Sequence, residues 1–478
     1  MLLKLIKFNV YRINIIFLLF MCIFSSSDVL AERNSNDSNL TLALAGDALV
    51  SIKLSIHEDP RFLELVDLIR SSDAAFANME MLFHDYESYP MHEHGGANLR
   101  ADPKLVGELK WAGFDMLSLA NNHTGDYGAA GMLLTKKYIN DAGYSASGVG
   151  ESLREARAPV FFDTPDGRIA LISVSSTFPE HSRAGNTRGD IPSHPGLNPL
   201  RHTKEYTLNS EQFNFIKNIS EKTYPDITSK TLGMDNNGDD RESAWFLGER
   251  FFLGKTLSIS SVPNDIDMKE IGDAVKSAKL VSDYVIVSLH AHESRGNDKT
   301  VPAEFITTFA RGMIDSGADI IVGHGPHVLR GIEVYKNKPI FYSLGNFIYP
   351  SLPYPSAYMR TPSELYEELS LDASGYDTSI VSTKISQLLG DGYQKVASEI
   401  SVNESVVVIP RWENGQLVNI NLYPIVIGEG TLHVNSGVPL RADKETSRRI
   451  VATLRNLSAP FGTIIRFHEK LGIGKIDF

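Results

Sequence analysis

Short clusters of carboxylate, carboxamide and imidazole side chains follow five apolar segments of the chain. The clusters are Gly46-Asp47, Asn78-Met79-Glu80, Asn121-Asn122-His123 with Asp126, His290-Ala291-His292-Glu293, and Gly323-His324-Gly325-Pro326-His327. Such side chains ligate divalent Zn, Mn, Fe or Mg at sites with open coordination positions. Two such ions about 4 Å apart can hold a phosphoryl group and activate water. These residue types therefore predict a shared divalent-metal or anion site.

Each cluster, taken singly, has a simpler interpretation. Asp47 follows a glycine, as turn residues do, and Asn78 and Glu80 are typical of residues that cap a following segment. A histidine after an aliphatic run, such as His290 or His324, is more often a hydrogen-bonded core residue. Five coincidences at the ends of predicted strands nevertheless favour one shared site over five separate explanations.

The apolar segments before the clusters alternate with amphipathic segments of helical length. Predicted strands cover residues 40–45, 74–78, 116–120, 169–174, 284–289, 319–322 and 339–343. Predicted helices cover residues 61–71, 103–112, 128–142, 267–282, 304–316 and 444–457. This alternation predicts an α/β fold in which β-sheets are flanked by helices. Because ligands bind outside the carboxyl ends of strands in open α/β sheets, the five clusters are expected to converge.

Two segments interrupt the alternation and a third follows it, in a chain whose 478 residues allow two or three domains. Residues 181–265 are rich in turn-forming residues, which predicts an insertion over one end of the core. Residues 351–402 predict a largely helical insertion. Residues 403–478 predict a small α+β extension packed on the core, with two strands paired across Glu413-Asn414-Gly415 and a final helix.

Residues 1–31 have the features of a secretory signal peptide. Lys4, Lys7 and Arg12 precede the apolar stretch 13–24, and small residues lead to a cleavage position after Ala31. The alternative is an uncleaved N-terminal membrane anchor, although this stretch is shorter than the roughly 20 residues that span a bilayer as a helix. The expected location is the periplasm, the cell surface or the extracellular medium.

Composition excludes several classes of protein. The 46 basic and 58 acidic residues give a formal net charge of −12, which argues against a general nucleic-acid binder. With 42% hydrophobic and 22% charged residues, the chain is neither disordered nor a polytopic membrane protein. The single cysteine, Cys22, excludes an intramolecular disulfide and a Cys-rich zinc site.

The order of the clusters resembles the calcineurin-like metallophosphatase superfamily and, more closely, the CapA family of poly-γ-glutamate capsule synthesis proteins. The matching segments are Leu44–Asp47, Ala77–Glu80, Ala120–Gly128, Ser288–Glu293, Gly323–Tyr335 and Ile340–Phe347. The resemblance implies a layered metallophosphatase-like core over residues 40–350. It also implies a role in poly-γ-glutamate, capsule or envelope polymer metabolism, with metal-dependent hydrolysis as the first hypothesis.

The resemblance also implies roles for individual residues. The implied metal ligands are Asp47, Glu80, Asn122, His123, His290, His324 and His327. His123, Asn122 and Asp126 would form the catalytic group, and Asn78 and Asn121 would contact substrate or orient other side chains. The implied cofactor is divalent Mn, Zn, Fe or Mg. The implied partners are poly-γ-glutamate or another anionic envelope polymer and a membrane synthase complex.

Two further expectations concern positively charged loops and the late histidines. Arg100, Arg183 and Arg188 are expected to contact the polymer, because a guanidinium group binds a carboxylate through two hydrogen bonds. Glycines let the backbone turn sharply in the loop that contains the late histidines, and Pro326 stiffens that loop. Both late imidazoles are therefore expected to face one crevice with His123 and His290, within several ångströms of Asp47.

The chain departs from the metallophosphatase pattern. Leu49 stands where a histidine ligand is expected, and Asn78 and Glu80 stand where a bridging aspartate is expected. Gly325-Pro326 separates the late histidines, and Ala291-His292 stands where the family commonly has Trp-Gly. A second hypothesis therefore stays open: a non-catalytic protein that binds, exports or assembles the polymer in the same crevice. The bond that an enzyme would cleave, phosphoester or amide, also stays open.

Overall fold

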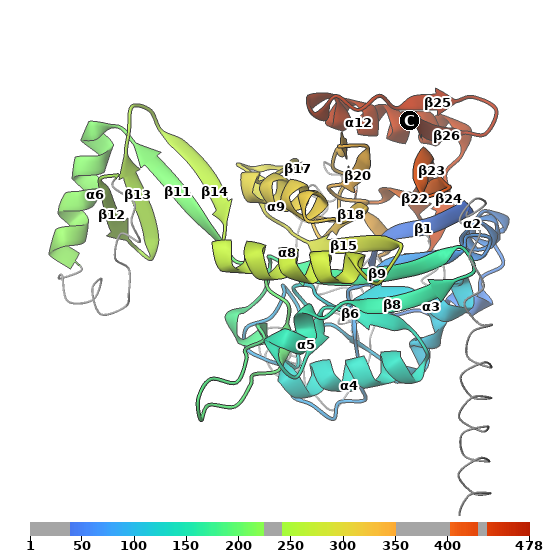
Figure 1. Cartoon of the computed structure of the whole chain (residues 1–478), viewed down its shortest axis with the longest axis horizontal. Coiled ribbons are helices and arrows are strands. Elements are labelled where there is room, and N and C mark those ends of the chain that lie inside the picture. Colours follow the sequence, from blue (N-terminus) through green and yellow to red (C-terminus); the bar gives the residue numbers. More distant parts are fainter. Residues whose placement is uncertain (1–38, 224–240, 350–401, 429–436) are drawn as a thin grey trace, which may run out of the picture. The chain divides into compact units, whose positions relative to one another are not determined.

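The computed structural model describes residues 39–223, 241–349, 402–428 and 437–478, which form a mixed α/β unit (Figure 1). The predicted signal peptide, residues 1–31, lies outside the described residues. The predicted helical insertion, residues 351–402, also lies outside them except for its last residue. In the described part of the chain, no helix is both long and apolar enough to cross a bilayer.

The first large sheet is built around the N-terminal strand of the described chain. Its strand order is β25 (Arg466–His468), β26 (Ile473–Asp477), β23 (Gln416–Ile427), β22 (Glu404–Glu413), β1 (Asn39–Ala48), β2 (Ala74–Met79), β5 (Met116–Ser118) and β6 (Ser145–Ser147). β21 (Asn346–Ile348) also pairs with β1, and β24 (Pro439–Arg441) pairs with β23. β1, β2, β5 and β6 are parallel, whereas β22 joins β1 antiparallel. The C-terminal strands were predicted as an extension packed on the core. In the structure they belong to the first large sheet itself.

The second large sheet carries the later polar clusters. Its strand order is β19 (Ile332–Tyr335), β20 (Lys338–Phe341), β18 (Ile320–His324), β15 (Tyr284–His290), β9 (Gly167–Ser175) and β8 (Val160–Thr164). The four inner strands are parallel, and both edge strands are antiparallel to their neighbours. Parallel strands are usually buried on both faces, which explains why these segments are almost continuously apolar in the sequence.

The two sheets pack face to face, and helices cover their outer faces. Leu42 and Phe76 of the first sheet meet Leu171, Ile286 and Val322 of the second in one buried cluster. The helices over the first sheet are α2 (Pro60–Arg70), α3 (Gly107–Ala112) and α4 (Gly128–Asp141), and those over the second are α8 (Asp265–Lys279) and α9 (Glu304–Asp315). α12 (Lys444–Ser458) adds side chains to the cluster between the sheets. The described layers are therefore helix, sheet, sheet, helix.

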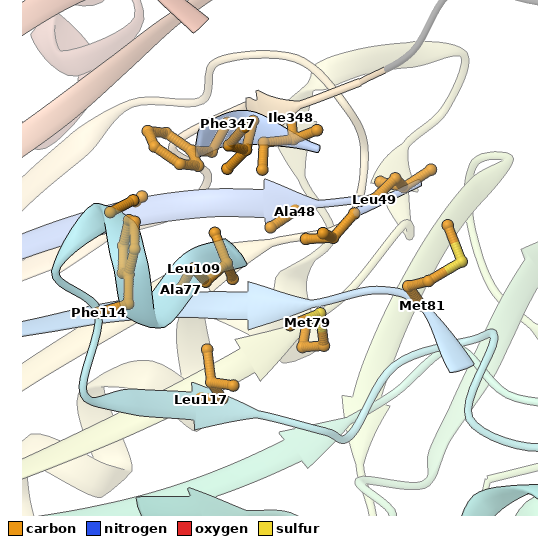
Figure 2. Close-up of a cluster of buried hydrophobic side chains, with 14 of the residues drawn as sticks. Ala48, Leu49, Ala77, Met79, Met81, Leu109, Phe114, Leu117, Phe347 and Ile348 are labelled. Atoms are coloured by element: carbon orange, nitrogen blue, oxygen red, sulfur yellow. The ribbon is translucent and has the colours of Figure 1, made fainter. Parts of the chain in front are cut away.

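Alternation along β1 shows how the sequence produces these layers. Leu42 and Leu44 face the second sheet, whereas Ala43 and Ala45 face the helices, because successive strand residues point to opposite faces. Figure 2 shows the helix-covered face, where Met79 and Leu117 of the sheet lie in the same cluster as Leu109 of α3. The large helix-side residues and the small alanines of β1 fill this layer together.

Part of the predicted insertion 181–265 forms a smaller sheet of its own. Its strand order is β12 (Ser243–Phe246), β13 (Glu249–Leu253), β11 (His202–Leu208) and β14 (Ser258–Pro263). α6 (Ser210–Thr223) packs on it through the fully buried Phe213. These strands were not predicted, because β11 and β14 are rich in polar residues and lack a long apolar run.

Candidate metal centre

The carboxyl ends of β1, β2, β15 and β18 bring five ligand-type side chains together. Asp47 is the last residue but one of β1, Glu80 follows β2, and His290 and His324 end β15 and β18. His290 and His324 are direct neighbours in the second sheet, since their Cα atoms are paired. His327 follows in the loop after β18. Parallel pairing therefore places side chains from distant parts of the sequence at one edge.

The first set of ligand atoms comes from Asp47, His290 and His324. The Nδ1 atoms of His290 and His324 are 3.0 Å apart. Asp47 Oδ1 lies 3.5 Å from His324 Nδ1 and 3.8 Å from His290 Nδ1. Bonds near 2 Å to a tetrahedral ion separate its ligand atoms by about 3.3 Å. The spacing of these three atoms therefore fits a single divalent ion.

Further ligand atoms lie on the other side of the His290 ring. Within the described residues, the sets whose ligand atoms lie within 4.8 Å of one another are Asp47–His290–His324, Glu80–His290–His292 and Asp47–Glu80–His327. His290 Nε2 lies 3.1 Å from His292 Nε2 and 3.7 Å from Glu80 Oε1. Because a neutral imidazole has one lone-pair nitrogen, His290 can serve only one of the two sets that share it.

Glu80 provides the test of whether this cluster fits a metal. Its side chain is fully buried, and neither carboxylate oxygen accepts a hydrogen bond from an N–H group or a hydroxyl of the described residues. A buried carboxyl group without a partner is costly, whereas a cation beside it would satisfy both oxygens. The donor set of carboxylates and imidazoles is also the one that Zn, Mn and Fe use. The residues present therefore fit a divalent ion.

Neighbouring polar groups fix the orientation of the ligand atoms. His327 Nδ1 donates to Asn346 Oδ1 at 2.9 Å, which leaves Nε2 of that ring as the free nitrogen. His324 Nε2 lies 2.6 Å from the Ser288 hydroxyl, which leaves its Nδ1 facing His290 and Asp47. Asp47 accepts hydrogen bonds from Asn78 Nδ2 at 2.8 Å and from the Gly325 amide at 2.9 Å. The cluster is thus held in place before any ion binds.

Burial sets the charge of the cluster. It raises the pKa of Asp47 to about 7 and raises the pKa of Glu80 well above its usual value. It lowers the pKa of His324 to about 3 and that of His327 to about 4, and it lowers the pKa values of His290 and His292 well below 6.5. At neutral pH the imidazoles are therefore neutral and keep a lone pair for a cation.

These shifts predict that the metal-free chain is most stable near pH 6.5. Below that pH the unfolded chain protonates four imidazoles that stay neutral in the folded chain, and these outnumber the two carboxyl groups that only the folded chain protonates. The free energy of unfolding therefore decreases as pH falls. Above that pH the unfolded imidazoles are neutral, while the folded chain still binds the carboxyl protons. The free energy of unfolding then decreases as pH rises.

Urea denaturation of chelator-treated protein at about pH 5, 6.5 and 8 measures both effects. Asp47→Asn is the matched variant, because its amide cannot titrate. Between about pH 6.5 and pH 8, we expect the free energy of unfolding to decrease less in this variant than in the wild type. A wild-type free energy of unfolding that rises steadily to about pH 8 would contradict the raised carboxyl pKa values.

His123 lies near enough to Asp47 to act on its charge, but it is outside the ligand sets of the described residues. Its Nδ1 lies 2.7 Å from Asp126 Oδ2, so Nδ1 is the protonated nitrogen and Nε2 is free. Asn122 donates to the Gly95 carbonyl at 2.7 Å, and its own Oδ1 is buried without a partner in the described chain. Asn121 accepts a hydrogen bond from the backbone amide of His123 at 3.1 Å. The segment thus forms a rigid imidazole–carboxylate pair rather than part of the carboxylate–imidazole sets.

The predicted polymer-binding arginines have other surroundings. Arg100 donates to the carbonyl of His84 at 2.9 Å and stacks on Tyr86, with 3.7 Å between its Cζ atom and the ring centre. The backbone of Arg188 pairs with Ile191. Arg183 lines a cleft of about 370 Å³ and pairs with Glu180 at 3.4 Å. The structure does not bring these three side chains into the cluster of described ligand atoms.

The Arg183 cleft nevertheless adjoins the loop that carries His123. His181 and Arg201 also line the cleft, and His181 Nε2 donates to the Gly125 carbonyl at 3.0 Å. Gly125 lies between His123 and Asp126 in the sequence. A ligand in this cleft would therefore lie beside the segment that orients the His123 imidazole.

Sequence reasoning missed His292 as a candidate ligand. The sequence placed His292 in a polar cluster after a predicted strand but did not name it among the implied ligands, yet its ring belongs to one of the ligand sets of the described residues. The spacing of the two histidines could have indicated this role, because residues two positions apart at the end of a strand point to the same face. His290 and His292 meet this condition.

The fold and the cluster define an α/β protein with buried carboxylate and imidazole groups at the carboxyl ends of its parallel strands. The chain belongs to the family described as bacterial capsule synthesis protein PGA_cap, whose family model matches residues 28–351. The predicted family membership is therefore confirmed.

Relatives extend this similarity over different lengths. Uncharacterized protein y4sH of Sinorhizobium fredii is 36% identical over 445 residues, which cover 91% of this chain and 92% of the relative. Capsule biosynthesis protein CapA of Bacillus anthracis is 27% identical over 324 residues, covering 66% of this chain and 61% of that protein. A crystal structure of a hypothetical protein from Thermus thermophilus is 11% identical, with a TM-score of 0.36, and covers 80% of this chain and 98% of that one. The last similarity is too low to support an argument.

Proposed function

We propose that this protein is an exported metal-dependent hydrolase that acts on poly-γ-glutamate or a related anionic polymer of the capsule or cell envelope. The unpartnered, fully buried Glu80 carboxyl group beside Asp47 and neutral imidazoles carries the metal part of the proposal. Membership in a capsule synthesis family, and the capsule biosynthesis name of the Bacillus anthracis relative, support the substrate class. The layering of helix, sheet, sheet and helix supports a metallophosphatase-like core.

Asp47, Glu80, His290, His292, His324 and His327 would hold the ion or ions, of Mn, Zn, Fe or Mg. A divalent ion there would polarise the scissile bond and lower the pKa of a water molecule towards about 7. The chain's own groups supply orientation and proton transfer. Asp126 holds the Nδ1 proton of His123, so that Nε2 is the atom able to give or take a proton at a phosphoester or amide bond.

The second candidate function is non-catalytic polymer binding, export or assembly in the same crevice. Leu49 favours it, because this side chain packs in the helix-covered core where the metallophosphatase pattern has a histidine ligand. A membrane synthase complex would then be the partner that passes the polymer on. For both candidates we propose export through residues 1–31, by cleavage or as an anchored protein.

Metal analysis followed by hydrolysis assays tests the proposal. Purified protein is expected to contain Mn, Zn, Fe or Mg, and Mn²⁺- or Zn²⁺-loaded protein is expected to hydrolyse p-nitrophenyl phosphate or poly-γ-glutamate. Protein that neither retains nor takes up a divalent ion would overturn the hydrolase mechanism. Saturable binding of poly-γ-glutamate by metal-loaded protein, without turnover of either substrate, would establish the second candidate instead.

A further inference from the structure

Arg330 places a buried cation behind the candidate metal centre. Its side chain is fully buried, and burial lowers its pKa to about 10. Within the described residues no carboxylate lies within 4.0 Å of its guanidinium group, so its partners there are backbone carbonyls. A buried charge of this kind is expensive, and an apolar side chain of similar size would fill the space at lower cost. The presence of a guanidinium group at this position calls for a function that an apolar side chain could not perform.

The guanidinium contacts identify the segment that Arg330 holds. Nη1 donates to the Ala291 carbonyl at 3.2 Å, and Nη2 donates to the carbonyls of His292 at 3.3 Å and Glu293 at 2.9 Å. Nε donates to the Lys299 carbonyl at 2.9 Å. Three consecutive carbonyls of the turn after β15 thus converge on one planar group. Because the guanidinium fork is rigid, it fixes their relative orientation.

Hydrogen bonds to Glu293 hold the same turn from its other side. The Glu293 carboxylate accepts from the Ser176 hydroxyl at 2.7 Å and from the Thr177 hydroxyl at 2.9 Å. The Thr177 hydroxyl also accepts from the His292 amide at 2.9 Å. The backbone of His292 is therefore fixed on both sides, and its imidazole lies 3.1 Å from that of His290.

We propose that Arg330 is a positioning residue of the metal centre: its guanidinium fork holds the turn 291–293 so that His292 presents its imidazole beside His290 and Glu80. The proposal rests on the proposed function for the ion itself. The contacts that it explains do not depend on an ion: they are the hydrogen bonds from Arg330 to three carbonyls and the distance of 3.1 Å between the Nε2 atoms of the His290 and His292 rings.

Cobalt binding tests this role. Arg330→Met removes the fork while keeping an unbranched side chain, and is expected to weaken Co²⁺ binding about 10- to 100-fold, the usual effect of losing an orienting group. Its Co²⁺ absorption spectrum should also differ from that of the wild type. Arg330→Lys, which keeps a charge and some hydrogen bonding, should lose less affinity, and it replaces Arg330→Met if that variant does not fold. Wild-type affinity and spectrum in the variant that folds would overturn the proposal.

Arg441→Met is the matched control for loss of a buried arginine. Arg441 is 8% exposed and donates to the Pro424 carbonyl at 3.2 Å, in the first sheet. This variant is expected to bind Co²⁺ as the wild type does, even where its melting temperature falls. Equal weakening in both arginine variants would show a general loss of stability and overturn the positioning role.

Hydrogen exchange of the metal-free chain separates this proposal from the proposed function. Arg330→Met should speed amide exchange in peptides covering residues 290–299 relative to β2, whether or not an ion binds. A wild type that binds no Co²⁺ would overturn the metal-dependent function. Unchanged exchange over residues 290–299 would overturn the Arg330 clamp, independently of any result with metal.

Discussion

Asp47→Asn is expected to weaken divalent-metal binding at least about 100-fold and to abolish any metal-dependent turnover. Asp47 takes part in two of the ligand sets found in the described chain. Its Oδ1 atom lies 3.5 Å from His324 Nδ1, and its Oδ2 atom lies 3.6 Å from His327 Nδ1. Asparagine keeps the size of the side chain but removes the negative charge, and its NH₂ group replaces one of the two oxygens that accept from Asn78 and from the Gly325 amide. The variant therefore isolates charge and donor type from packing.

Calorimetric titration with Mn²⁺ or Zn²⁺ measures the affinity, and metal analysis after gel filtration measures the bound ion. Asp73→Asn is the matched control, since Asp73 precedes the same strand β2 at its opposite end and accepts hydrogen bonds from Thr41 at 2.7 Å. That variant should bind metal as the wild type does. Wild-type affinity in Asp47→Asn would show that the ion binds without Asp47 and would overturn its assignment as a ligand.

The convergence of the strand-end clusters could be predicted because parallel sheets impose it. Asp47, Glu80, His290 and His324 each end or follow an apolar strand, and all parallel strands of a sheet expose their carboxyl ends at one edge. The sequence did not show that two sheets contribute to the site. In the structure, the clusters after β1 and β15 come from different sheets that pack face to face. Alternation along one strand cannot show which sheet the strand joins.

Side-chain direction in turns explains what the sequence could not show. His123 was predicted as a ligand; the turn after β5 pairs its Nδ1 with Asp126 and leaves Nε2 free, outside the ligand sets of the described residues, so its role as a ligand stays a prediction. The role of Arg330 was hidden because its partners are backbone carbonyls, which carry no residue-specific signal. The pairing of β22 with β1 joins residues more than 350 positions apart, and local patterns do not encode such a register.

His123→Ala is expected to abolish most hydrolysis while leaving the ion in place. The His123 ring lies outside the ligand sets of the described chain, and Asp126 fixes the tautomer that leaves Nε2 free. Loss of a general acid or base typically costs about 10²- to 10⁴-fold in rate. The measurement is turnover of p-nitrophenyl phosphate and of poly-γ-glutamate by Mn²⁺- or Zn²⁺-loaded protein, with metal content determined on the same sample.

His57→Ala is the matched control, because His57 is 8% exposed and His123 is 7% exposed. The His57 ring packs edge-on against Phe62 of α2 and belongs to none of the ligand sets of the described residues, so this variant should keep both metal and turnover. Loss of the ion from His123→Ala would make His123 a ligand, as the sequence first indicated, and would remove it as the proton-transfer group. Full turnover with the ion retained would show that the reaction does not use this imidazole. A slow variant that retains its ion is the one outcome that separates the group that moves the proton from the groups that hold the metal.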